Sequence, residues 1–233
     1  YANTTLRQFW TSQHHSGNFL NMEKQLVVPG TTASQLSCPI SNLDTLTGKF
    51  AVSDYIKARA KLNPSNVDAL LTEPTDFNYG TAVWLYEHLR QIARDIGFLL
   101  AELTDTICTP TTCSEMNVVV PGVEAQFHYL CAAHVGTSNC SAIDYSTHTL
   151  EGVVSLLNNA QAFPSRIDIA NKSIPKFRTM LRRLYRILAH SYFHHMDTFM
   201  KFESQKFVTL RVHTLALKYS LIPADQLIIP GMR

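Results

Sequence analysis

Residues 182–195 read Arg-Arg-Leu-Tyr-Arg-Ile-Leu-Ala-His-Ser-Tyr-Phe-His-His, and they decide the fold together with Cys108-Thr-Pro-Thr-Thr-Cys113 earlier in the chain. Four residues separate Cys108 from Cys113, and four separate His190 from His195. Two thiolates and two imidazoles complete the tetrahedral shell of a structural zinc ion, so one ion can join these two distant segments. The sequence therefore predicts a closed site with two cysteine and two histidine ligands.

Helical spacing leaves the second histidine of this site open. At 3.6 residues per turn, His190 and His194 share a face, whereas His190 and His195 diverge by about 140° around the axis. Spacing alone thus favours His194 over His195.

A second group of possible ligands follows the first cysteine pair. It could form its own shell of two nitrogen and two sulfur atoms. The alternative is a pair of buried thiols beside the imidazoles of a hairpin. The residues concerned are His128, Cys131, His134 and Cys140.

Four arginines precede the histidines on the same predicted helix. Arg178, Arg182 and Arg186 follow one another at four-residue steps, and Arg183 flanks them. We expect Arg182, Arg183 and Arg186 to converge from one side of the helix. Arginine offers planar forked donors suited to phosphate, so the pattern predicts a phosphate site; a solvated helix face is the alternative.

Composition limits the class of protein. The chain has 233 residues, 45% of them apolar, with 20 basic and 18 acidic side chains and a net charge of +2. One domain is expected, and no global field draws it to nucleic acid or to an anionic membrane. Neither a membrane-spanning run nor the pattern of a signal peptide is expected. Five cysteines, two of them paired with histidines, favour a reducing compartment such as the cytosol.

Periodicity predicts a mainly helical fold. Residues 1–50 are polar and lack a sustained period, so we expect an extended, partly disordered arm. Alternation around Pro121-Gly122 predicts a small hairpin within residues 116–134. Ser53 is the expected cap of the first helix. Helices are expected at residues 53–61, 79–106, 147–160, 173–203 and 207–219, which together predict an all-α bundle.

These motifs resemble the Mob family of kinase-associated adaptors, and within it the phocein-like, striatin-associated branch. The resemblance covers roughly residues 50–230. Besides the cysteine pair and the Arg-His run, it rests on five stretches: Tyr86-Glu-His-Leu-Arg90, Tyr129-Leu-Cys-Ala-Ala-His134, Ala142-Ile-Asp-Tyr145, His148-Thr-Leu and Phe163-Pro-Ser-Arg166.

The resemblance implies a four-helix-bundle scaffold of Mob type without catalysis, spanning residues 51–233. It implies one structural zinc ion held by Cys108, Cys113, His190 and His195, with His195 in place of His194. It further implies a phosphate pocket at Arg182, Arg183 and Arg186. The arm before residue 50 and an apparent insertion at 118–123 receive no role from it.

The partners implied are a striatin-type scaffold and a phosphorylated segment of a sterile-20-type kinase, with protein phosphatase 2A joined indirectly. The expected place is the cytoplasm, including peripheral association with Golgi or other membranes. Neither a nucleic-acid partner nor a transmembrane segment is expected.

Three alternatives stay open. The first is a kinase co-activator of the NDR/LATS-binding Mob type. The second is a zinc hydrolase, suggested by His194 and His195 beside Asp197, which would need an exchangeable water on the metal. The third is a nucleic-acid module, suggested by the arginine row, which would bind with steep salt dependence.

Overall fold

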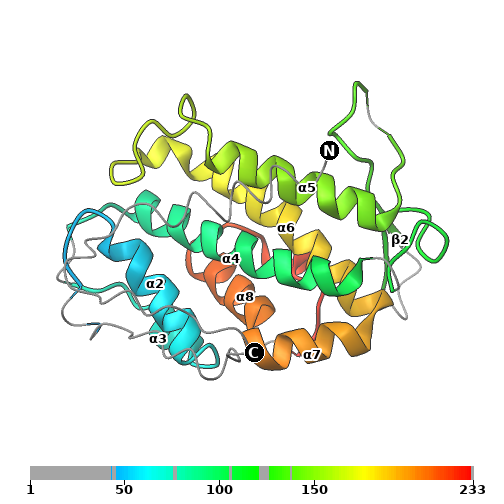
Figure 1. Ribbon diagram of the computed structural model, residues 1–233, viewed down its shortest axis with the longest axis horizontal. Helices are drawn as coiled ribbons and strands as arrows, with labels where there is room; N and C mark the ends of the chain where they lie inside the picture. The colour runs from blue at the N-terminus through cyan, green and yellow to red at the C-terminus, as the bar shows by residue number, and fades with distance from the viewer. Residues whose placement is uncertain are drawn as a thin grey trace, which may run out of the picture.

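The computed structural model describes residues 43, 46–75, 78–104, 107–120, 126–136 and 138–231. Within them the fold is predominantly helical with one small sheet, as expected (Figure 1). The predicted N-terminal arm lies almost entirely outside the described residues. The elements are α2 Ala51–Leu62, α3 Val67–Leu70, α4 Thr81–Leu103, β1 Asn117–Val119, β2 Gln126–His128, α5 Ala142–Leu157, α6 Ile174–His194, α7 Met196–Lys206 and α8 Val208–Lys218, with single 3-10 turns at Asn171–Ser173 and Ala224–Gln226.

Helix α4 is the centre of the molecule. It packs against α2, α5, α6, α7 and α8, and Figure 1 shows it running between α5 and α6 on one side and α7 on the other. Its apolar residues recur at steps of three and four, and Trp84, Leu89, Ile92 and Ile96 are fully buried. A helix that is covered on most sides needs such a wide apolar surface. The long helix predicted within residues 79–106 is therefore confirmed, with bounds of Thr81–Leu103.

Two short-range predictions are wrong. Helix α5 begins at Ala142 rather than near residue 147, because Ser141 caps it: the Ser141 hydroxyl accepts a hydrogen bond from the Asp144 backbone N–H at 3.3 Å and donates to the Asp144 carboxylate at 2.6 Å. Ser53, the expected cap of the first helix, lies inside α2 and is buried.

The segment read as one helix over 173–203 is two helices. Helix α6 ends at His194 and α7 begins at Met196, and His195 between them has φ −139° and ψ 51°, outside the helical region. The predicted helix over 207–219 is confirmed as α8. The predicted hairpin is also confirmed, because β1 pairs antiparallel with β2, with Val118 opposite Phe127.

Buried charges join α4 and α7 to α8. Arg211 of α8 donates to the carboxylate of Asp95 on α4, and both side chains are buried. The Glu203 carboxylate accepts hydrogen bonds from the backbone N–H groups of Thr209 (2.9 Å) and Leu210 (3.0 Å) at the start of α8. Removing one partner of such a pair leaves an uncompensated buried charge, so these contacts hold the helices in one arrangement.

Among the described residues, no helix combines the length and apolar character that crossing a bilayer requires.

The acid stability of the fold depends on buried histidines. His213 of α8 is buried with its Nε2 3.2 Å from the Tyr185 hydroxyl, and burial lowers its pKa to about 4. Because the unfolded chain takes up this proton near pH 6.5, stability is fully present above that pH. It is lost as the pH falls toward 4.

We predict that His213→Gln, which stays neutral, reduces this acid loss. Between pH 7.5 and pH 5 the wild type should lose about 2 kcal/mol more free energy of unfolding than the variant. Urea denaturation of both proteins, prepared in the same way, at the two pH values measures the difference. Equal losses in the two proteins would contradict the assignment.

Candidate functional site

Two thiols and two imidazoles converge at one end of the bundle. The four possible ligand atoms of Cys108, Cys113, His190 and His195 all lie within 4.8 Å of one another, and we call these residues the first cluster. The Cys108 Sγ is 3.6 Å from His190 Nε2, and the Cys113 Sγ is 3.5 Å from His195 Nε2. Zinc–ligand bonds of about 2.3 Å to sulfur and about 2.05 Å to nitrogen give a tetrahedral S···N edge of about 3.6 Å. The spacing therefore suits zinc.

The loop that carries the two cysteines is held by its own hydrogen bonds. It starts just after α4, where the Cys108 N–H donates to the Leu103 carbonyl at 2.9 Å. The Thr109 N–H donates to the Thr112 hydroxyl at 2.8 Å, and the Cys113 N–H donates to the Thr109 carbonyl at 2.8 Å. A closed turn of this kind presents both sulfur atoms to the same point.

The end of α6 explains which histidine joins the cluster. On a continuous helix His195 would face away from His190, but His195 is the non-helical residue between α6 and α7. Its ring lies 5.3 Å from that of His190, measured between centroids. His194 stays on the helix and stacks on His190, but lies outside the group of four ligand atoms.

Hydrogen bonding and burial prepare His190 as a ligand. Its Nδ1 lies 2.8 Å from the Asn117 carbonyl, so Nδ1 carries the donated proton and Nε2 keeps its lone pair toward the cysteines. Burial lowers the pKa of His190 to about 4, and burial followed by the nearby His194 also lowers the pKa of His195. Both imidazoles are thus neutral near pH 7, as metal binding requires.

The first cluster has a proton to release on binding a cation. Burial, followed by the neighbouring Cys113, raises the pKa of the Cys108 thiol to about 12. Without a cation, Cys108 is therefore protonated at neutral pH. A metal binds the thiolate, so occupation of the site would displace this proton.

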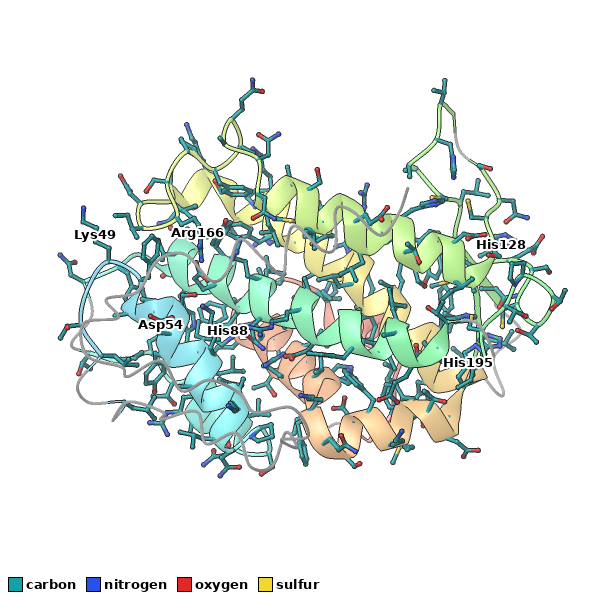
Figure 2. The ribbon with its side chains drawn as sticks, viewed as in Figure 1. Lys49, Asp54, His88, His128, Arg166 and His195 are labelled. Carbon is teal, nitrogen blue, oxygen red and sulfur yellow. The ribbon has the colours of Figure 1, made fainter. Side chains whose placement is uncertain are left out.

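A second cluster differs by one residue from the possible ligand set considered from the sequence. The possible ligand atoms of Cys131, His134, Cys140 and His148 also lie within 4.8 Å of one another. His128, which the sequence suggested as a possible member of this group, instead contacts Glu115 and Asn139. His128 lies on β2 at the same end of the molecule as His195 (Figure 2). The possible set considered from the sequence therefore included His128 wrongly and omitted His148.

His148 was missed because of where α5 begins. With the helix expected to start near residue 147, nothing in the sequence directed His148 toward Cys131 and Cys140. Its true position, two turns into a helix capped by Ser141, directs it back over Cys131 and Cys140. The recurrence Cys131, His134, Cys140, His148 in a single stretch was the available signal.

The geometry of the second cluster is less regular than that of the first. The His148 Nδ1 lies 3.6 Å from the Cys131 Sγ and 3.9 Å from the Cys140 Sγ, close to the tetrahedral edge. The distance from His134 Nε2 to the Cys140 Sγ is shorter, at 3.0 Å. His134 is exposed to solvent, whereas Cys131 is buried. The donor set suits zinc, at a site more open than the first cluster.

The arginines of α6 occupy distinct positions. Arg182 and Arg183 are exposed, and Arg186 is half-buried. The Arg186 Nη1 donates to the Tyr145 hydroxyl at 2.9 Å, and its guanidinium lies 4.4 Å from the centre of the Tyr129 ring. Among the described residues, no carboxylate forms an ion pair with these three arginines.

Two cavities meet at Arg186. One of about 160 Å³, which we call the α5–α6 cavity, is lined by Cys131, Tyr145, His148, Gly152, Arg183 and Arg186, among others. The other, of about 330 Å³, which we call the hairpin cavity, is lined by residues that include Phe127, Tyr129, Arg182, Arg186 and Asp225. The three arginines therefore do not share one cavity: Arg186 borders both, Arg182 the second and Arg183 the first.

Charge distinguishes the two cavities. Of the described residues that line the α5–α6 cavity, none is Asp or Glu, whereas Asp225 borders the hairpin cavity. Two guanidinium groups without a nearby carboxylate make the α5–α6 cavity the better site for an anion.

Comparison with known proteins identifies the family of the chain. The model of the Mob1/phocein family matches residues 59–230. The chain is similar to a Drosophila melanogaster protein named MOB kinase activator-like 4, with 38% identity over 203 residues, or 87% of each chain. It is also similar to a Caenorhabditis elegans protein named MOB-like protein phocein, with 41% identity over 179 residues, or 77% of each chain. The chain therefore belongs to the Mob1/phocein family.

Proposed function

We propose that this protein is a non-catalytic, zinc-stabilised adaptor that binds a phosphorylated protein segment through the arginines of α6. Arg186 carries the proposal. Its guanidinium is held by Tyr145 and Tyr129, borders two cavities, and lacks a carboxylate partner among the described residues. An arginine that is fixed in place and unpaired has its remaining donors available for a ligand.

A phosphoresidue has the chemistry that this site requires. It carries about −1.5 to −2 charges and three acceptor oxygens near pH 7. Arg186 and Arg183 can supply several forked donors to those oxygens in the α5–α6 cavity, while Arg182 lies beside the hairpin cavity, where flanking residues of the ligand can pass. Arg182, Arg183 and Arg186 together form the proposed phosphate-binding set.

Zinc has a structural role in the proposal. The first cluster would hold one ion between the loop after α4 and the end of α6, and the second cluster would hold another. Four protein ligands fill a tetrahedral shell and leave no position for an activated water, which argues against the zinc hydrolase. In this proposal residues 51–233 form one domain, a Mob-type four-helix bundle, and its stability depends on zinc.

The proposed partners follow from the family. One relative is named phocein and another is named a kinase activator-like protein. We assign to this chain a striatin-type scaffold and a phosphorylated sterile-20-type kinase as partners, with protein phosphatase 2A joined through the scaffold. The thiols of both clusters must stay reduced to bind metal, which fits the cytoplasm and its membrane surfaces, the Golgi included. The near-neutral charge of +2 fits a protein ligand better than nucleic acid.

A second candidate function is co-activation of a kinase of the NDR/LATS type. The name of the Drosophila melanogaster relative, MOB kinase activator-like 4, favours it. An adaptor would bring the kinase to the scaffold without changing its turnover. A co-activator would raise the phosphorylation rate of a purified NDR/LATS kinase in the absence of any scaffold.

For the first cluster, we predict that His195→Gln and His194→Gln have opposite outcomes. His195→Gln should lose the zinc of this cluster and much of the cooperative fold, because a structural zinc contributes on the order of 10 kcal/mol. His194→Gln should keep both. Elemental analysis and thermal unfolding of the two purified variants measure this. Retention of zinc by His195→Gln with an unchanged melting temperature would reject the ligand set.

For the arginine site, we predict that Arg186→Glu weakens binding of phosphothreonine peptides selected from a random library by about tenfold to hundredfold. Hydrogen bonds to charged groups contribute about 1.5–3 kcal/mol, and the introduced carboxylate adds repulsion. Arg178→Glu is the matched control, since it reverses the same charge on α6 at an exposed residue that borders neither cavity. Fluorescence polarisation with phosphorylated and unphosphorylated peptides gives the affinities. Equal binding of the two peptide forms to the wild type would refute the phosphate site.

The α5–α6 cavity can be tested by filling it. Gly152 of α5 lies on its wall, and a Cβ added there meets nothing within 4 Å. We predict that Gly152→Leu blocks phosphopeptide binding while stabilising α5 by up to about 1 kcal/mol, because glycine is unfavourable inside a helix. A Gly152→Ala variant, whose methyl group leaves most of the cavity open, should bind like the wild type. Normal binding by Gly152→Leu would place the phosphate outside this cavity.

A further inference from the structure

The second cluster and the phosphate site share a wall. Cys131 and His148 belong to the second cluster, and both line the α5–α6 cavity together with Arg183 and Arg186. The residues that would hold a metal ion thus border the space that would hold the phosphate. The second cluster and the proposed phosphate site are therefore direct neighbours.

The loop of the second cluster has little else to fix it. Its described residues between Cys131 and Ser138 are all exposed, and Val135 is completely so. One bridge closes the loop, with the Cys131 N–H donating to the Ser138 carbonyl at 2.8 Å and the reverse bond at 3.0 Å. A loop without buried apolar side chains keeps much of its conformational freedom unless a cross-link removes it. A metal ion bound by Cys131, His134 and Cys140 is such a cross-link.

The residues that hold Arg186 are next to the ligands in sequence. Tyr129, whose ring lies under the guanidinium, precedes Cys131 by two residues. Tyr145, which accepts the hydrogen bond from Arg186, precedes His148 by three residues and therefore shares its side of α5. An ion joining Cys131 to His148 would fix the spacing between the segments that carry these two tyrosines.

We propose that a metal ion in the second cluster keeps the wall of the α5–α6 cavity and the Arg186 side chain in their phosphate-binding arrangement, so that phosphopeptide affinity depends on this ion. The inference rests on the proposed phosphate-binding function. It makes the second cluster a positioning element, because none of its ligands needs to touch the phosphate. A metal ion in the first cluster would stabilise the helical bundle, and one in the second cluster would fix the arrangement of the phosphate-binding side chains.

The test uses the full chain loaded with zinc and the variants Cys140→Ser and His134→Ala. Each variant should carry one zinc ion instead of two and should bind the selected phosphothreonine peptide about tenfold more weakly, within the range of about 5- to 150-fold typical of coupled sites. The helical circular dichroism signal should be unchanged. His134 is exposed, so its removal leaves the core intact.

Two further variants separate metal loss from other effects. His134→Cys replaces one zinc ligand by another and should restore both the second ion and the affinity. His128→Ala removes an imidazole on β2 that is outside the cluster, and it should change neither quantity. Recovery by His134→Cys would show that the ion, rather than the imidazole itself, supports binding.

The outcomes distinguish this inference from the function on which it rests. A wild type with a single zinc ion, or variants that lose one ion and keep full affinity, would overturn the inference while leaving the phosphate site in place. A wild type that binds phosphorylated and unphosphorylated peptides equally would overturn both. The inference is supported if the wild type binds the phosphopeptide in an Arg186-dependent way and the variants both lose one zinc ion and bind the phosphopeptide more weakly.

Discussion

The convergence of Cys108, Cys113, His190 and His195 is the constraint on which the rest of the structure depends. Two thiols from the loop after α4 meet two imidazoles from the end of α6, and together they form a donor set that can hold one metal ion. The loop turn, the hydrogen bond from His190 to β1 and the change of direction after α6 all serve this meeting.

The same helix carries the arginines of the proposed phosphate site. Arg186 lies one turn before His190 on α6, so the packing that places the imidazole also places the guanidinium. The contacts from Tyr129 and Tyr145 then restrict the arginine from the hairpin side and from α5. In the proposed adaptor, bundle stability and phosphate recognition are therefore connected through one rigid helix.

Sequence patterns were sufficient for some elements and not for others. The apolar period of residues 79–106 and 207–219 located α4 and α8, because burial on a wide face leaves a strong local signal. The start of α5 depends on a single hydroxyl group, that of Ser141. The break at His195 accompanies the contact of its imidazole with Cys113, which is distant in sequence. Neither alters periodicity, so His148 was missed and one helix was expected where two exist.

The non-helical residue at the end of α6 has a consequence for how this sequence can vary. Each residue added to a helix turns everything beyond it by about 100°, so one insertion between His190 and His195 would carry the second imidazole away from the sulfur atoms. The number of residues between His190 and His195 is therefore limited by the geometry of the four donor atoms. Any change in that number would separate the two imidazoles even if both histidines were kept.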